Sequence, residues 1–99
     1  MHRHTVLFNF KDEVDSATRD GVIRSLRSLS ELPTVSAMMV EKNLLPPGNM
    51  APYEWLLVGD FADRKARDAY ETDERHAIVV RQKFLPYVKS FAMIDVDHD

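Results

Sequence analysis

Apolar and polar residues alternate at the start of the chain and predict a β-strand over residues 4–11. One face of this strand carries a histidine followed by three apolar side chains: His4, Val6, Phe8 and Phe10. The opposite face is mixed but contains Leu7. A strand with apolar residues on both faces is typical of the centre of a sheet that is covered on both sides. We therefore expect helices on the first face and a second layer on the other.

Helical spacing of apolar residues predicts a first helix over residues 16–32. Asp15 or Ser16 can cap its start, and Pro33 ends it. Its apolar stripe consists of Val22, Ile23, Leu26 and Leu29.

A second helical region begins after Ala62 or Asp63 and ends at Pro86. The polar run at residues 72–74 can break or re-cap it, which divides its apolar positions into two groups. The first group is Ala66, Ala69 and Tyr70, and the second is Val79, Val80 and Phe84.

Three further strands are predicted over residues 35–42, 53–61 and 88–96, where apolar residues again alternate with other residues. Residues 43–52 contain three prolines and one glycine, so we expect an exposed loop there. Residues 97–99 are expected to form a loose tail.

The resulting order, βαββαβ, predicts an α+β, ferredoxin-like sandwich with the first and third strands in the centre. The helices can cover only one face of such a sheet. The other face is expected to expose an apolar area too large for a monomer, formed by Leu7, Leu56, Val58, Phe91 and Met93. We therefore predict a homodimer in which two sheets face each other and form an α+β barrel.

Length and composition narrow the possibilities further. A chain of 99 residues makes a single domain, residues 1–99. The net charge of −3 and the mixture of bases with acids argue against a nucleic-acid partner. There is no cysteine, no glycine-rich phosphate loop and no ligand cluster, so we expect neither cofactor nor metal. No apolar run approaches the roughly 20 residues that span a bilayer, and no signal peptide is visible. We expect a cytoplasmic protein without a membrane partner.

The sequence resembles the stress-responsive A/B barrel domain family, whose members are dimeric α+β barrels. The likeness runs from about Arg3 to Asp95 and depends on the order of several short motifs. These are the opening segment of residues 4–11, Phe61-Ala62-Asp63, Ala69-Tyr70, Asp73, His76 and Ile94-Asp95.

The resemblance implies a chemistry. The family's best understood enzyme type is the plant polyketide cyclase called olivetolic acid cyclase, which closes a linear polyketide by aldol condensation without cofactor or metal. By this resemblance Tyr70 and His76 are the catalytic pair, and His4 is a pocket histidine. The family often has a second histidine followed by proline just after the tyrosine, whereas this chain has Thr72-Asp73-Glu74.

The residue types fit that chemistry. A histidine, with its ordinary pKa of about 6.5, can remove a proton next to a carbonyl, and a tyrosine hydroxyl can stabilise the enolate oxygen. Six residues on one unbroken helix amount to roughly 600°, so Tyr70 and His76 share a face only if the helix is interrupted at residues 72–74. Apolar side chains that could line a pocket with His4 are Val6, Phe8, Val22, Leu26, Trp55 and Leu57.

Two function classes remain open at this stage. One is a cofactor-independent enzyme or binder for a small carbonyl or phenolic compound. The other is a non-catalytic dimeric structural or stress-response module, in which the same apolar residues fill the core and Tyr70 and His76 are structural. A metal held by His4 with His76 or Asp95 is a weaker alternative, because no ligand spacing supports it.

Overall fold

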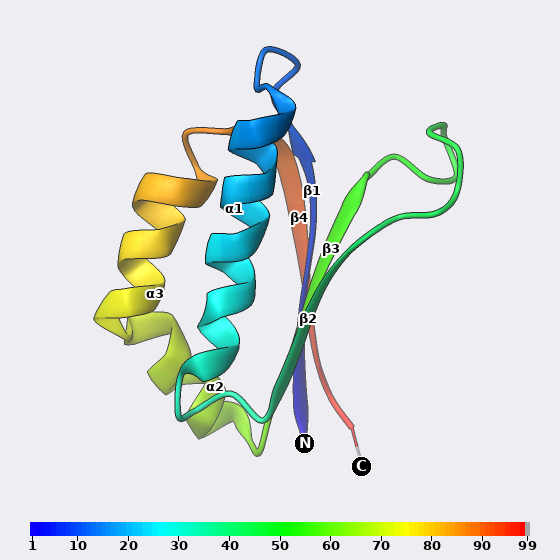
Figure 1. The fold of residues 1–99 in the computed structure, drawn as a ribbon. Coiled ribbons are helices and arrows are strands. Elements are labelled where there is room, and N and C mark those ends of the chain that lie inside the picture. Colours follow the sequence, from blue (N-terminus) through cyan, green and yellow to red (C-terminus); the bar gives the residue numbers. More distant parts are fainter. Residues whose placement is uncertain (99) are drawn as a thin grey trace.

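The strands form one antiparallel sheet with all helices on one side (Figure 1). The computed structural model describes residues 1–98. The strands are β1 (His2–Phe10), β2 (Ala37–Lys42), β3 (Trp55–Phe61) and β4 (Val88–Asp97), in the spatial order β2-β3-β1-β4. The predicted ferredoxin-like α+β fold is therefore confirmed, and β1 and β3 are the central strands as expected.

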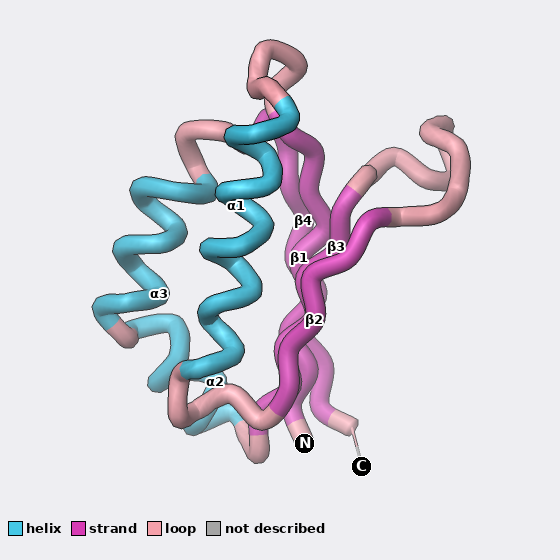
Figure 2. Tube along the Cα trace, in the orientation of Figure 1, coloured by secondary structure: helices cyan, strands magenta, loops and turns pink. Residues whose placement is uncertain are grey.

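The second helical region divides at Asp73, within the polar run at residues 72–74 where the sequence allowed a break. The helices are α1 (Ser16–Ser28), the 3-10 helix η1 (Leu29–Glu31), α2 (Arg64–Thr72), α3 (Glu74–Val79) and the π-helix η2 (Val80–Phe84). Asp15 caps α1 and Asp63 caps α2, each accepting a hydrogen bond from the backbone N–H three residues later. Figure 2 shows α1 and α3 side by side over the sheet, with α2 below them.

The tail prediction is wrong for the residues that the structure describes. Asp97 belongs to β4 and pairs with His2, so β1 begins two residues earlier than expected. Beyond the strand, His98 and Met1 exchange backbone hydrogen bonds of 2.8 Å in both directions. Asp99 lies outside the described residues.

The prediction that Phe91 and Met93 lie on the open face, which is the face of the sheet that no helix covers, is also wrong. In β4 they pair with Phe8 and Val6, so their side chains lie on the helix side of the sheet. The cause is a bulge near Asn9 and Phe10, where the β1–β4 register shifts by one residue. Such a shift reverses the facing of every residue beyond it.

The open face is nevertheless apolar. It keeps the predicted Leu7, Leu56 and Val58 and gains other side chains through the register, namely Met39, Ala92, Ile94 and Val96. Of these, Met39, Ile94 and Val96 are about half exposed in the single chain. A contiguous apolar face of this kind is typical of an interaction surface.

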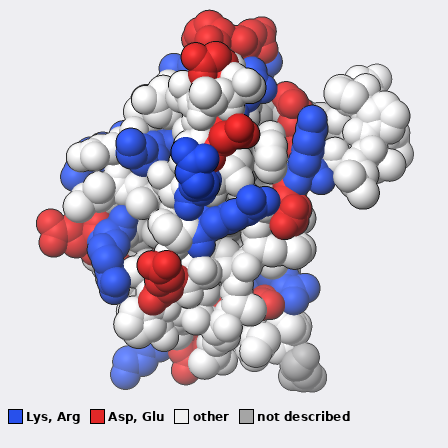
Figure 3. Space-filling model, viewed as in Figure 1, with Lys and Arg blue, Asp and Glu red and all other residues white. Residues whose placement is uncertain are grey.

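The β2–β3 connection is an exposed loop, as predicted. Figure 1 shows it projecting from the sheet on the side away from the helices. Leu44 and Met50 are each 96% exposed, and Figure 3 shows no charged side chain on this lobe. Elsewhere in that view Lys and Arg alternate with Asp and Glu. Within residues 1–98, no helix is long and apolar enough to span a membrane.

Candidate functional site

A cavity of about 320 Å³ lies between the sheet and the helices α2, α3 and η2. Its wall is mainly apolar, with a few polar groups, as small-molecule sites commonly are. Six of the nine predicted site residues line it: His4, Val6, Leu26, Leu57, Tyr70 and His76.

The other three predicted site residues, Phe8, Val22 and Trp55, do not reach the cavity. Phe8 and Val22 are completely buried. Trp55 stacks on Phe8 with ring centroids 6.4 Å apart and meets the edge of Phe10 at 6.2 Å. This end of the helix-side layer is a filled core, because aromatic rings occupy the space between strand and helix.

Asp73 creates the interruption on which the site depends. Its backbone is extended (φ −63°, ψ 131°), it ends α2, and its carboxylate accepts the backbone N–H of Arg75 to cap α3. The change of direction brings the Tyr70 and His76 rings to a centroid distance of 4.3 Å. The two residues therefore meet although six positions separate them.

Tyr70 presents an unpaired hydroxyl to the cavity. The residue is 2% exposed, and its ring contacts Phe61 and His4 at 5.0 and 6.4 Å. Within residues 1–98 its hydroxyl forms no hydrogen bond, although buried tyrosine hydroxyls usually find a partner. Burial raises the pKa of Tyr70 well above its ordinary value, so the phenol stays protonated and can donate.

His76 is held in one tautomer. Its Nδ1 lies 3.2 Å from the Glu71 carbonyl oxygen, which can only accept, so Nδ1–H donates and Nε2 keeps its lone pair. Burial lowers the pKa of His76 and, together with the electrostatic effect of Arg67, outweighs the hydrogen bond to the Glu71 carbonyl, which would raise it. A neutral imidazole with a free Nε2 is the form that a general base requires.

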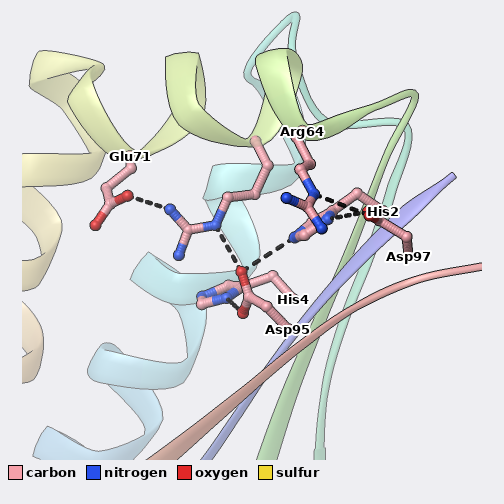
Figure 4. Close-up of polar contacts among 7 residues, drawn as sticks. His2, His4, Arg64, Glu71, Asp95 and Asp97 are labelled. Carbon is pink, nitrogen blue, oxygen red and sulfur yellow. Dashed lines mark hydrogen bonds and ion pairs between the residues drawn. The ribbon is translucent and has the colours of Figure 1, made fainter.

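A polar network closes the cavity at the N-terminal end of β1, and Figure 4 shows it. Its members are His2, His4, Arg64, Arg67, Glu71, Asp95 and Asp97. Asp95 is its centre: Oδ1 accepts from His4 Nδ1 at 2.5 Å, and Oδ2 accepts from His2 Nε2 at 3.0 Å and Arg67 Nε at 2.9 Å. His4 therefore keeps Nε2 available to the cavity that it lines.

His2 is an imidazolium in this network. Its Nδ1 lies 2.7 Å from Asp97, and its Nε2 faces Asp95, so both nitrogens donate to carboxylates. Hydrogen bonds to Asp97 and Asp95 raise the pKa of His2. Burial works to raise the pKa of Asp95, but its hydrogen bonds with His4 and His2 and the charge of Arg67 outweigh burial and lower it to about 2.

Sequence reasoning missed several residues of the site. Phe91 and Met93 line the cavity because of the β-bulge, and Val80, Phe84 and Leu85 line it from the wide turn of η2. A π-helix inside a longer helical region often marks a functional site. Arg67 and Glu71 also line the cavity, and their four-residue spacing along α2 is the one sequence signal that could have indicated a pair.

The carboxylates of the polar network are already paired within the protein. They are bonded to histidines and arginines. Within residues 1–98, no group of three His, Asp or Glu side chains is placed to hold a metal ion.

Comparisons with known proteins agree with this architecture. A Mesorhizobium loti protein of the Dabb family with a ferredoxin-like fold has a TM-score of 0.85 and 26% identity, covering 98% of this chain and 95% of that one. A dimeric ferredoxin-like protein of unknown function from Thermobifida fusca has a TM-score of 0.82 and 23% identity, and the match covers 96% of this chain and 88% of that one. A hydroxynitrile lyase from Passiflora edulis has a TM-score of 0.86 and 13% identity, and the match covers 96% of this chain and 90% of that one.

Among proteins with curated descriptions, none matches this sequence. The profile of the family described as the stress responsive A/B barrel domain (Dabb) matches residues 3–98. Since that match spans nearly the whole chain, the protein belongs to the stress-responsive A/B barrel domain family.

Proposed function

We propose that the protein is a homodimeric α+β barrel that binds a small, largely apolar carbonyl or phenolic compound and acts on it by cofactor-independent acid–base chemistry. The observation that carries the proposal is the meeting of Tyr70 and His76, ring centroids 4.3 Å apart, in the wall of an apolar cavity. One residue supplies a neutral donor and the other a neutral acceptor, which is the pair that enolate formation needs.

The proposed reaction begins when His76 Nε2 removes a proton next to a carbonyl. The electron pair of that C–H bond moves to the carbonyl oxygen, and the Tyr70 hydroxyl donates a hydrogen bond to the resulting enolate. The enolate carbon then attacks a second carbonyl of the same molecule, forming a C–C bond. The new alkoxide takes the proton back from the His76 imidazolium, so the protein ends as it began.

The open face of the sheet and the β2–β3 loop support the dimer. The open face presents a continuous apolar surface formed by Leu7, Leu56, Val58 and Ile94, which a second copy can cover. The β2–β3 loop projects on that side of the sheet (Figure 1), and its Leu44 is 96% exposed, so the loop can contact the partner. The relatives described as dimeric share this fold.

Light scattering at micromolar concentration tests the dimer. We expect twice the 11.4 kDa mass of the chain, and we expect Leu56→Glu to give monomers or unfolded protein, because it places an unpaired charge in the interface. Glu54→Gln, a change close by in sequence, serves as the control and should remain dimeric. A clean monomer of the wild-type protein would refute the dimer.

An NMR titration of the histidine side chains tests the chemistry. His76→Ala assigns the signal, and a panel of phenolic and β-diketone compounds is then added. We expect the His76 pKa to lie below about 6.5 and its signal to shift with ligand. If His76 titrates at its ordinary value and no compound moves it, the non-catalytic dimeric module is the correct alternative, and it retains the same open-face interface.

A further inference from the structure

We infer that the cavity selects ligands that carry a carboxylate, which Arg67 binds at the rim by displacing Glu71. Because the cavity must first be a ligand site, this inference rests on the proposed function and adds the class of compound that fits. It depends on three features of Arg67: its unused N–H groups, its movable partner and the charge left when that partner leaves.

Arg67 has donors to spare in a nearly buried position. Its side chain is 15% exposed and lines the cavity together with Tyr70 and His76. Nε donates to Asp95 and one Nη1 hydrogen points to Glu71, while Nη2 forms no hydrogen bond within residues 1–98. A guanidinium has five N–H donors, so the edge formed by the two Nη atoms is only partly used. That edge has the geometry that binds both oxygens of one carboxylate.

Glu71 is the replaceable partner. Its side chain is 59% exposed, whereas the other carboxylate on Arg67, Asp95, is 31% exposed and also bonded to His2 and His4. Because the Glu71 carboxylate lies mostly in solvent, water can replace much of what it loses when it leaves Arg67. Glu71 also lies in the last turn of α2, two residues before the break at Asp73. A ligand carboxylate that brings apolar burial with it can therefore take its place on Arg67.

The charges of the polar network favour an incoming anion. Its cations are His2, Arg64 and Arg67, and its anions are Glu71, Asp95 and Asp97, so the network is neutral when Glu71 is bound. When Glu71 turns to solvent, one positive charge remains at the cavity wall. That charge lies in a partly desolvated site, where an ionic hydrogen bond is stronger than at the surface.

The test compares acids with their amides. Dissociation constants are measured by NMR for 4-hydroxybenzoate and 3-(4-hydroxyphenyl)propanoate, each against its carboxamide, which has nearly the same shape without the charge. Wild-type protein should bind the acids at least about tenfold more tightly, the value of one charged hydrogen bond. Arg67→Gln should remove that preference.

Glu71→Gln provides the sharper arm because it leaves Arg67 and the core in place. Removing the competing carboxylate should tighten acid binding about two- to fivefold and leave amide binding unchanged. Arg64→Gln is the matched control: it removes one cation from the same helix, pairs with Asp97, and is not in the cavity wall. Its acid affinity should fall by less than about twofold, because Arg64 is 77% exposed and solvent screens its charge.

The outcomes separate this inference from the proposed function. Equal binding of acids and amides, or equal losses in the Arg64 and Arg67 variants, would overturn the carboxylate preference while leaving a ligand cavity. Unchanged acid affinity in Glu71→Gln would overturn the displacement of Glu71. If neither acids nor amides bind at millimolar concentration, the phenolic ligand class fails, and the carboxylate preference fails with it.

Discussion

The two ends of the helix-side layer are built from the same strand but differ in what fills them. At the C-terminal end of β1, Phe8 and Phe10 are completely buried, and Phe8 meets Trp55 and Phe84. At the N-terminal end, His2 and His4 occupy the equivalent positions of the same face. There, polar partners replace the aromatic rings, and the space in front of them stays open as the cavity.

The difference shows how one strand can provide both stability and a site. Side chains at the filled end gain free energy in proportion to the apolar area they bury. At the cavity end, hydrogen bonds hold the polar groups, and their net contribution is smaller for each group. The polar end can therefore keep an unpaired hydroxyl and a free imidazole nitrogen without unfolding the domain.

The largest expected effect is at the filled end. Phe8→Ala should lower the free energy of unfolding by about 3–5 kcal/mol, because it leaves a cavity in a fully packed core. Urea unfolding at fixed protein concentration measures it. Phe91→Ala is the matched control, since Phe91 is the cross-strand partner of Phe8 but is 46% exposed. It should cost less than half as much, and equal costs would mean that the cavity wall is packed as tightly as the filled core.

A smaller loss is expected at the centre of the polar network. Asp95→Asn should cost about 1.5–3 kcal/mol of unfolding free energy, the usual range for hydrogen bonds to a charged group. The amide cannot accept from His2, His4 and Arg67 as the carboxylate does. Asp97→Asn, at a more exposed carboxylate, should cost less. A value for Asp95→Asn within 0.5 kcal/mol of the wild type, an ordinary surface effect, would contradict the central role of Asp95.

The sequence predicted the fold better than the details of the cavity, for a physical reason. Apolar alternation and helical spacing depend on local periods, so the fold, the central place of β1 and the interruption near Asp73 could all be predicted. The facing of Phe91 depends on a bulge in the β1–β4 pairing. The pairing of His4 with Asp95 depends on a register that joins positions 91 residues apart, and no local pattern encodes it.

The free energy of unfolding should depend on pH through the titration of His2. Its pKa is raised in the folded protein by Asp97 and Asp95, so its contribution to stability is full below the unfolded value of about 6.5 and is lost as pH rises through the folded value. Asp95, with its pKa lowered to about 2, contributes fully above about 3.9 and loses its contribution as pH falls. Both contributions are therefore complete between those two unfolded values.

Urea unfolding at pH 5.5 and pH 9 tests the His2 part. Wild-type protein should lose more stability across this interval than His2→Gln, which has no titrating group there. His76 works in the opposite direction, because its lowered pKa makes it favour the folded state as pH rises. The comparison with His2→Gln cancels that contribution. The same pH slope in both proteins would show that His2 is not held as an imidazolium.

The smallest effect on stability is expected from Tyr70→Phe, although it lies at the proposed site. The hydroxyl has no hydrogen-bond partner within residues 1–98, so its removal should change the unfolding free energy by less than about 1 kcal/mol, and a gain is compatible with burial of the bare ring. Binding of a β-diketone should nevertheless weaken by about two- to tenfold, the value of one neutral hydrogen bond. Tyr53→Phe, outside the cavity wall, should change neither quantity. If Tyr70→Phe instead destabilised the protein by 2 kcal/mol or more and left binding unchanged, the hydroxyl would be structural, and the cavity end would differ from the filled end only in polarity.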